Sequence, residues 1–238
     1  MTYNRLPRAV LFDMDDTLID YTGGIDNCWH EACLLHAANC GVNPEQLYGA
    51  IDKFRRWYWG DPVRHAAKRM DMKGARREIV VGALETLGCI DNRAAHALAD
   101  SFTQSREEYH RLFPDTIATL EHAKRQGVLM ALITNGHPSS QRPKIEKFGL
   151  APFFDCIVIE GEFGIGKPDS RVYEHALQAL GVLPNETWMV GDNLEWEVAA
   201  PQKLGIAGIW MDSAGNGLPK GSTVRPDRII RRLWELWE

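Results

Sequence analysis

From residue 116 onward the chain alternates between short apolar runs and segments with helical spacing of apolar residues, and this pattern restricts the possible folds most. The apolar runs lie at 128–133, 156–159, 188–190 and 206–210, and the helical segments at 116–126, 139–148, 170–180 and 194–204. Strands that alternate with helices form a parallel sheet with right-handed crossovers. An earlier run at 8–13 is rich in β-branched and aromatic residues, which is typical of a buried strand. The pattern predicts an α/β fold with a doubly wound, Rossmann-like parallel sheet.

A long helical block separates the first predicted strand from the others. It lacks strand-like runs, and its helical spacing recurs at 27–40, 44–58, 74–88 and 92–110. We therefore expect a core domain made of residues 1–20 and 112–238, with an all-helical domain, residues 21–111, inserted after strand one. At the C-terminus an amphipathic helix that docks on the sheet is expected from Ile229, Ile230, Leu233, Leu236 and Trp237.

Two aspartates follow the first predicted strand, one residue apart. Because side chains alternate along an extended backbone, Asp13 and Asp15 point the same way. Carboxylates crowded at the end of a strand repel each other unless a cation or a shared proton compensates. Ligands of open α/β sheets bind at this same edge. The pair therefore indicates a reactive or metal-binding site.

The other predicted strands also end in polar residues. Thr134-Asn135-Gly136 follows one strand, Lys167 lies in the loop after the next, and Asp192 and Glu197 follow a third. Carboxylates without His or Cys partners favour a hard cation, most simply Mg²⁺. Hydroxyl, ammonium and backbone N–H groups suit an anion such as phosphate. Together these residue types predict metal-assisted phosphoryl transfer.

A glycine-rich segment imitates a nucleotide-binding loop. Gly161 and Gly166-Lys167 have the spacing of a P-loop, but Pro168 stands where such a loop needs Ser or Thr. Because the proline supplies neither a hydroxyl nor an N–H group, this interpretation is disfavoured.

In order along the chain, these motifs resemble those of the haloacid dehalogenase superfamily of aspartate-nucleophile hydrolases. The matching segments are Asp13-Met14-Asp15-Asp16-Thr17, Thr134-Asn135-Gly136, Lys167-Pro168 and Gly191-Asp192 with Glu197. The resemblance covers nearly the whole chain, and the helical insertion is similar to the C1-type cap of subfamily I.

The resemblance implies a role for each motif residue. Asp13 would be the nucleophile that forms an aspartyl-phosphate, and Asp15 the general acid and then the base. Thr134 and the Asn135 N–H would hold the phosphoryl oxygens, and Lys167 would neutralise Asp13 and the phosphate. Asp13, Asp192 and the Asp15 carbonyl would bind Mg²⁺. Where the family usually has Asp, this chain has Glu197, which we expect to support the metal through a bound water.

Charge and apolar content exclude several classes of partner. The formal net charge is −5 and the pI about 5.9, which argues against nucleic-acid binding. No apolar stretch is long enough to span a membrane, and no signal-peptide pattern precedes the first strand. The five cysteines form no CxxC motif, as expected for a reduced cytoplasmic protein. Monomer and homodimer both remain open.

The expected function is Mg²⁺-dependent hydrolysis of a small phosphorylated metabolite. A 2-haloacid dehalogenase shares the nucleophile, but halide leaves without a proton, so the second acid, Asp15, disfavours it. A phosphomutase would use the same motifs and stays open as an alternative. A phosphate-sensing binding protein is a third possibility that the acid Asp15 argues against.

Overall fold

The structure is a computed structural model of the chain and describes residues 6–89 and 91–238. The chain divides into two compact units, one formed by Met1–Tyr21 with Arg111–Glu238 and the other by Thr22–His110. Each unit has a hydrophobic core of its own.

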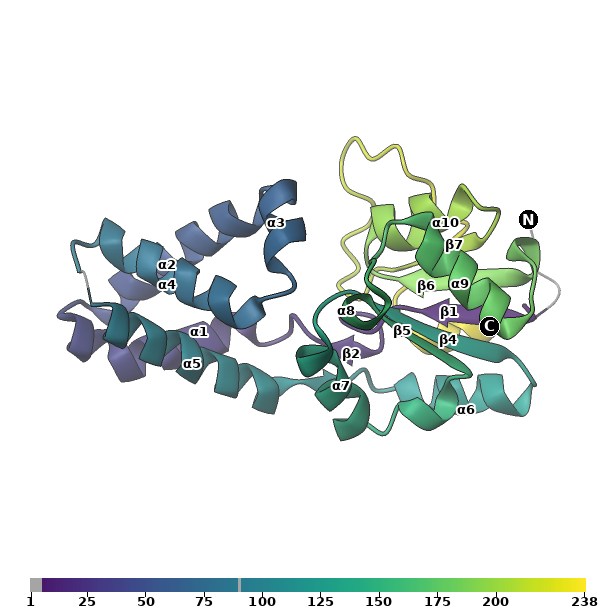
Figure 1. Cartoon of the computed structure of the whole chain (residues 1–238), viewed down its shortest axis with the longest axis horizontal. Helices are drawn as coiled ribbons and strands as arrows, with labels where there is room; N and C mark the ends of the chain where they lie inside the picture. The colour runs from purple at the N-terminus through teal and green to yellow at the C-terminus, as the bar shows by residue number, and fades with distance from the viewer. Residues whose placement is uncertain (1–5, 90) are drawn as a thin grey trace. The chain divides into compact units, whose positions relative to one another are not determined.

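The first unit is built on a six-stranded parallel sheet with the strand order β5-β4-β1-β6-β7-β8 (Figure 1). The strands are β1 (Ala9–Phe12), β4 (Leu129–Thr134), β5 (Cys156–Ile159), β6 (Thr187–Gly191), β7 (Ala207–Met211) and β8 (Arg228–Ile230). The order places β1 at the centre, with β4 on one side and β6 on the other. The predicted α/β class with a doubly wound parallel sheet is confirmed.

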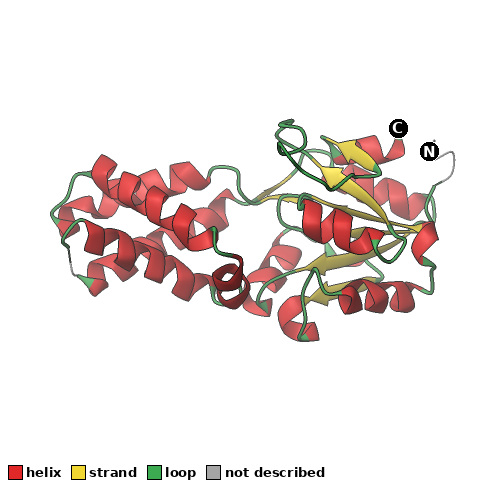
Figure 2. Cartoon of the chain, turned by 90° about the horizontal axis from the view of Figure 1, so that it is seen from above, coloured by secondary structure: helices red, strands yellow, loops and turns green. Residues whose placement is uncertain are grey.

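Helices cover both faces of this sheet, as Figure 2 shows. They are α6 (Thr116–Arg125), α7 (Pro138–Lys147), α8 (Glu160–Phe163), α9 (Ser170–Leu180) and α10 (Ala200–Gln202). Val10 and Phe12 of β1 belong to the core that includes α6 and α7, whereas Ala9 and Leu11 belong to the core that includes α9 and α10. This alternation follows from the two-residue period of a strand, and it explains why β1 is apolar at every position.

The predicted C-terminal helix is wrong in its first half. Ile229 and Ile230 lie in β8, which pairs with β7, and only Leu233–Trp237 are helical, as a 3₁₀ segment. The two adjacent β-branched residues suit an extended edge strand, and the remaining segment is too short for a stable α-helix. Leu233 and Leu236 are buried against the sheet, as expected.

Two further local features differ from the expectation. The helix expected at 194–204 is a π-helix over Leu194–Ala199 followed by the short α10. In addition, β2 (Ile19–Asp20) and β3 (Arg111–Leu112) form a small antiparallel pair. These strands are two residues long, which is too short to give a periodic signal in the sequence.

The second unit, within its described residues, is all-helical. Its α-helices are α1 (Ile25–His36), α2 (Pro44–Trp59), α3 (Pro62–Lys68), α4 (Met72–Thr86) and α5 (Asn92–Tyr109), and a 3₁₀ turn over Ala37–Cys40 follows α1. Side chains of Asn43, Asp61 and Asp71 cap the first N–H groups of α2, α3 and α4. The rings of Trp29 and Phe102 stack at 3.5 Å between centroids and join α1 to α5.

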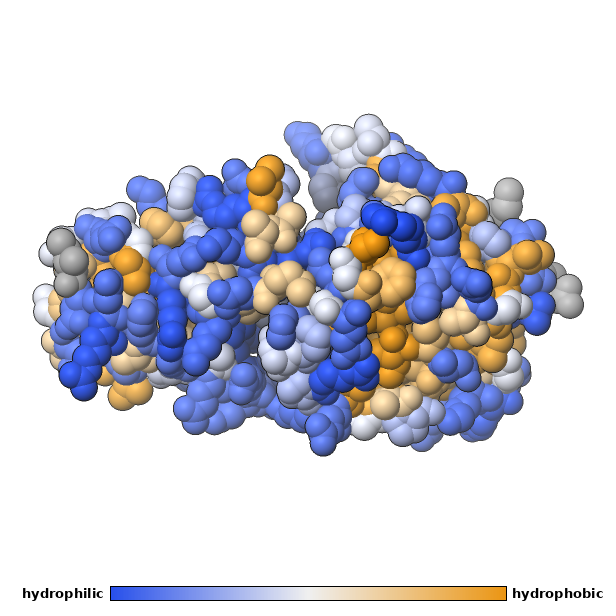
Figure 3. All heavy atoms as spheres, viewed as in Figure 1, coloured by the Kyte–Doolittle hydropathy of each residue, from blue (hydrophilic) through white to orange (hydrophobic). Residues whose placement is uncertain are grey.

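Most of the surface seen in Figure 3 is hydrophilic. The large apolar side chains that stay exposed are Leu6, Leu34, Leu35, Trp57, Val63, Leu183 and Ile229. Across the described residues, no helix combines the length and the apolar character that crossing a membrane requires.

The C-terminal 3₁₀ segment should contribute to stability through its buried leucines. Leu233→Ala should lower the free energy of unfolding of the sheet-containing unit by about 2–5 kcal/mol, because it leaves a cavity. Leu183→Ala makes the same change at a side chain that is 61% exposed, so its effect should stay below about 0.5 kcal/mol. Urea denaturation measures both, and equal effects would contradict the packing described for Leu233.

Candidate active site

The carboxyl ends of the central strands bring the expected site residues to one edge of the sheet. Asp13 directly follows β1, and its N–H donates to the carbonyl of Val190 in β6 at 2.9 Å. Thr134 is the last residue of β4, and Asp192 directly follows β6. Because β4 and β6 both pair with β1 in parallel, these residues lie around the end of β1.

A tight turn after β1 presents the two aspartates. The carbonyl of Met14 accepts hydrogen bonds from the N–H groups of Leu18 and Ile19 at 2.9 and 3.0 Å. Asp16 adopts a positive φ of 62°, a conformation that Asp tolerates better than most residues, and its carboxylate accepts from the Tyr21 N–H at 3.1 Å. The role of Asp16 is therefore to close the turn.

Lys167 is the cation that the buried aspartate needs. Its side chain is 1% exposed, and its Nζ lies 2.5 Å from Asp13 Oδ1 and 2.8 Å from Glu197 Oε1. Burial disfavours the ammonium, but Asp13 and Glu197 more than offset this and raise the pKa of Lys167 above its ordinary value. Burial also raises the pKa of Asp13, and the charge of Lys167 opposes that increase. Thr17 Oγ1 donates to the other oxygen, Asp13 Oδ2, at 3.1 Å.

The side chain of Asn135 fixes the loop that carries Lys167. Its Nδ2 donates to the Lys167 carbonyl at 2.8 Å, and its Oδ1 accepts from the Lys167 N–H at 2.8 Å. Gly166 leaves room for this contact, since a methyl group there would lie 2.7 Å from Asn135 Oδ1. Asn135 therefore uses its side-chain amide for the loop, and the expectation that its backbone N–H holds a phosphoryl oxygen stays a prediction.

Glu197 lies in the π-helix and faces Lys167. Its carboxylate is 1% exposed, and its Oε2 accepts from the Asn193 N–H at 2.7 Å. A methyl group on Gly191 would lie 2.0 Å from Glu197 Cγ, so the glycine is required for this placement. Burial raises the pKa of Glu197 to about 7, and Lys167 opposes the shift. The expectation that Glu197 supports a metal through water stays a prediction, and the described partners of its carboxylate are Lys167 and Asn193.

Asp192 lies at the same edge of the sheet, and several of the groups near it are carboxylates. Desolvation by the protein and repulsion from Asp13, Glu197 and Asp16 raise the pKa of Asp192 to about 9. Because Asp192 is exposed at its surface, repulsion from the neighbouring carboxylates is the main cause of this shift. Trp210 Nε1 donates to the Asp192 carbonyl at 2.6 Å and holds this residue in place.

Two residues of α7 that the sequence analysis missed join the site. Lys144 Nζ lies 2.6 and 2.5 Å from the two carboxylate oxygens of Asp15. Gln141 Nε2 lies 3.1 Å from Asp15 Oδ2 and 2.6 Å from Thr134 Oγ1. Their spacing of three residues places both on one side of the helix that follows Thr134-Asn135-Gly136. That spacing is the signal in the sequence that could have identified them.

The donor set at this edge fits a small hard cation. Among residues 6–89 and 91–238, no group of three His, Cys, Asp or Glu side chains forms a metal-binding cluster. The expected ligands are different in kind, namely the side chains of Asp13 and Asp192 and the backbone carbonyl of Asp15. Mg²⁺ is commonly held by one or two carboxylates while it keeps several waters. The negative charges that repel Asp192 and raise its pKa are the charges that such a cation would neutralise.

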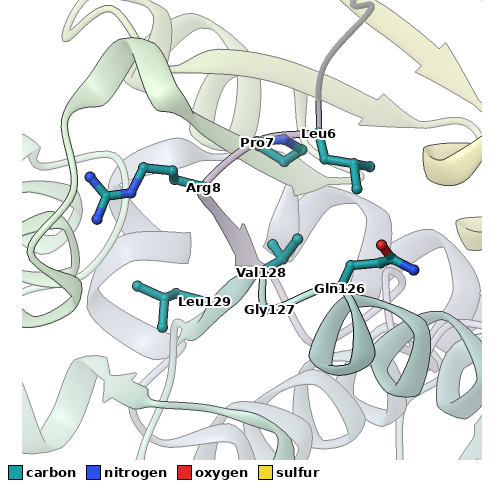
Figure 4. A pocket seen from close by; sticks show the side chains of 7 residues that line it. All are labelled: Leu6, Pro7, Arg8, Gln126, Gly127, Val128 and Leu129. Carbon is teal, nitrogen blue, oxygen red and sulfur yellow. The ribbon is translucent and has the colours of Figure 1, made fainter.

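A cavity of about 620 Å³ opens at the opposite end of the sheet. Figure 4 shows its lining residues, which come from the segment before β1 and from the segment that leads into and begins β4: Leu6, Pro7, Arg8, Gln126, Gly127, Val128 and Leu129. It contains none of the residues that the sequence assigned to the site. The strand carboxyl ends therefore remain the candidate active site.

The raised pKa values predict how stability depends on pH in metal-free buffer. In the unfolded chain Asp192 and Glu197 ionise near pH 4, whereas in the folded protein they hold their protons to about pH 9 and about pH 7. Their contribution to the free energy of unfolding is therefore largest below pH 4 and is lost as the pH rises through the folded values. Urea denaturation in EDTA should show this decrease.

Asp192→Asn should flatten that decrease. Asp169→Asn is the control, because a hydrogen bond from Arg171 lowers the pKa of Asp169 to about 2. Loss of this carboxylate should not flatten the decrease in stability with rising pH. An unchanged slope in the Asp192 variant would contradict the charge repulsion described for this edge.

Comparison with known proteins identifies the family. The model of the haloacid dehalogenase-like hydrolases matches residues 7–205. Phosphoserine phosphatase from Thermus thermophilus is 40% identical over 163 residues, which are 68% of this chain and 64% of that protein. N-acylneuraminate-9-phosphatase from Mus musculus is 29% identical over 231 residues, or 96% of this chain and 92% of that protein. The match to the first relative thus spans less than two thirds of its length.

Solved structures give the same fold. The magnesium-bound hydrolase YfnB from Bacillus subtilis aligns with a TM-score of 0.75 at 20% identity and covers 98% of both chains. A 2-haloacid dehalogenase from Pseudomonas syringae aligns with a TM-score of 0.61 at 27% identity, over 98% of this chain and 96% of the other. The names of the two sequence relatives agree with the expectation of a phosphoric monoester hydrolase. The chain belongs to the haloacid dehalogenase-like hydrolase family.

Proposed function

We propose that this protein is a Mg²⁺-dependent phosphatase that hydrolyses a small phosphorylated metabolite through an aspartyl-phosphate on Asp13. The observation that carries the proposal is the buried contact of 2.5 Å between Asp13 Oδ1 and Lys167 Nζ. It supports an ionised nucleophile beside a cation that can also face a phosphoryl group. The named relatives, which are phosphatases, support the same class of reaction.

In the first half of the reaction a carboxylate oxygen of Asp13 forms a bond to phosphorus, and the bond from phosphorus to the leaving oxygen breaks. Asp15 gives its proton to that oxygen, so an alcohol leaves. In the second half a water attacks the phosphorus and gives a proton to Asp15, while the bond to Asp13 breaks and inorganic phosphate leaves. Asp15 thus returns to its starting protonation state.

The other site residues hold the phosphoryl group. Thr134 Oγ1 and the Asn135 N–H would donate to its oxygens, and Lys167 would neutralise part of its charge. A bound Mg²⁺, held by the side chains of Asp13 and Asp192 and the Asp15 carbonyl, would supply further neutralisation of the developing negative charge.

We further infer that the helical unit, residues 22–110, acts as a cap that selects the leaving group. Its α2 and α3 carry a cluster of aromatic and cationic side chains in which Arg64 stacks on Trp57 at 3.8 Å. Trp57 is 59% exposed, so one face of this cluster is available to a ligand. A metabolite small enough to be enclosed by a closing domain is the substrate class that this arrangement favours.

Other activities of the same family would differ in their need for a proton donor or in the group that accepts the phosphoryl. Release of halide by a 2-haloacid dehalogenase needs no proton donor, whereas this chain positions a second acid at Asp15. A phosphomutase would return the phosphoryl group to an organic acceptor instead of water.

A screen of phosphorylated metabolites with Mg²⁺ tests the proposal. Steady release of inorganic phosphate from at least one of them is expected. Halide release from 2-haloacids, transfer of phosphate to a second sugar, or a stable phosphorylated protein without turnover would each overturn it in favour of the matching alternative.

Activity should depend on Mg²⁺. Hydrolysis of an aryl phosphate should vanish in EDTA and return when Mg²⁺ is added, because the carboxylates at the strand ends repel each other without a cation. Mg²⁺ should also raise the melting temperature of the wild type and have little effect on Asp192→Asn. Full activity in EDTA would contradict the proposed metal requirement.

Substitutions of Asp13 and Asp15, the two aspartates after β1, should differ in their effects. Asp13→Asn should abolish turnover and phosphoenzyme formation, because an amide cannot replace the carboxylate as the nucleophile. Asp15→Asn should slow turnover by about 10²–10⁴-fold, the usual range for a general acid and base. Rapid-quench detection of phosphoenzyme distinguishes the two variants. Near-normal turnover of either variant would refute the role assigned to the residue that it replaces.

A further inference from the structure

Lys144 is a buried lysine to which the proposed reaction gives no role. It is 7% exposed, and its ammonium contacts both carboxylate oxygens of Asp15, at 2.6 and 2.5 Å. The ammonium also lies 4.6 Å from the centre of the Tyr21 ring. Lysine is almost never fully buried unless it is paired, and here the partner is the acid of the proposed reaction.

Gln141 lies one helical turn before Lys144 and contacts the same carboxylate. It is 3% exposed, and its Nε2 lies within hydrogen-bond distance of Asp15 Oδ2 (3.1 Å), Thr134 Oγ1 (2.6 Å) and the Asn135 carbonyl (2.7 Å). An amide nitrogen carries two hydrogens, so these acceptors share them. One side chain therefore ties the acid to the phosphoryl-binding segment.

This contact also orients the Thr134 hydroxyl. Because Thr134 Oγ1 accepts from Gln141, its own hydrogen must point elsewhere. Its contact with the Asn135 carbonyl spans 3.5 Å, which is long for an O–H···O hydrogen bond. The hydroxyl hydrogen thus stays available for a phosphoryl oxygen.

We propose that Lys144 and Gln141 are positioning residues that hold the Asp15 carboxylate in the orientation required for proton transfer. The proposal deepens the proposed function and rests on it, since it assigns a support to the acid of that reaction. A general acid acts only within hydrogen-bond reach of the oxygen that receives its proton. Contacts with both carboxylate oxygens restrict the rotation of the Asp15 side chain, and α7 supplies those contacts from a single rigid element.

A purely structural role for Lys144 would predict a different kinetic pattern. If the lysine only relieved repulsion between Asp13 and Asp15, its loss would disturb the nucleophile as well as the acid. Attack by Asp13 would then slow with every substrate. If the lysine positions Asp15, attack should stay fast whenever the leaving group needs no proton.

The test compares Lys144→Met with Lys147→Met in Mg²⁺. Lys147 lies on the same helix and is exposed, so it provides the same chemical change away from Asp15. Stopped-flow measurement with 2,4-dinitrophenyl phosphate follows the burst of dinitrophenolate, which reports attack by Asp13. Steady-state phosphate release and hydrolysis of an alkyl phosphate report the steps that need Asp15.

For Lys144→Met we expect a dinitrophenolate burst close to the wild-type rate, followed by phosphate release slowed by about 10²-fold as phosphoenzyme accumulates. Hydrolysis of the alkyl phosphate should fall by a similar factor, because its leaving oxygen needs the proton. Lys144→Arg keeps the charge and should recover part of the loss. Lys147→Met should match the wild type.

A burst slowed as much as phosphate release would overturn the proposal, and so would wild-type kinetics in Lys144→Met. If Lys144→Met does not fold, Lys144→Arg carries the same comparison, because a displaced cation should still slow the Asp15 steps more than the burst. Gln141→Leu should slow phosphate release more than the burst, although the burst should also slow to some extent because Gln141 contacts Thr134. Wild-type protein that releases no phosphate from any ester would instead refute the proposed function itself.

Discussion

The active-site edge of this protein depends on one buried cation, the ammonium of Lys167. Asp13 is buried at the end of the central strand, and an unpaired carboxylate there would carry a large desolvation cost. Lys167 removes that cost, but it lies in a loop far along the chain and must itself be held. The Asn135 amide fixes its backbone, and Glu197 shares its charge. Removing one partner of such a buried pair typically costs about 3–5 kcal/mol, so nucleophile and fold are coupled here.

Much of this edge can be predicted from the sequence because its chemistry lies at strand ends. Apolar runs separated by helical segments predict the parallel sheet, and a parallel sheet brings its carboxyl ends together. Asp13, Thr134 and Asp192 each directly follow such a run, so their grouping follows from topology. Lys167 lies in the loop after β5, and the Asn135 side chain holds that loop in place. The order of the motifs then gives the family, which the match over residues 7–205 confirms.

What the sequence does not reveal depends on side-chain direction within helices and on short strands. Gln141 and Lys144 stand in a polar stretch of α7 with a proline between them, and polar residues on a helix are usually solvated. In the fold both contact Asp15 in the turn after β1, a contact between distant parts of the chain that the helical pattern does not show. The β8 strand is three residues long, so an apolar pattern near the chain end fits a helix equally well.

Glu197 stands where the family usually has Asp, and the local backbone geometry explains the longer residue. A π-helix carries this residue, and its carboxylate reaches back to Lys167 Nζ at 2.8 Å across a glycine, Gly191. An aspartate at this position would be shorter by one carbon–carbon bond, about 1.5 Å. In this backbone it would lose either the lysine or the Asn193 N–H, which the longer side chain contacts together. The longer side chain of Glu197 is therefore the one that reaches both partners from the π-helix. It has room to do so because Gly191 has no side chain. The contacts of its carboxylate with Lys167 Nζ and the Asn193 N–H tie Glu197 to the same buried cation as Asp13, and its support of a metal through water stays a prediction.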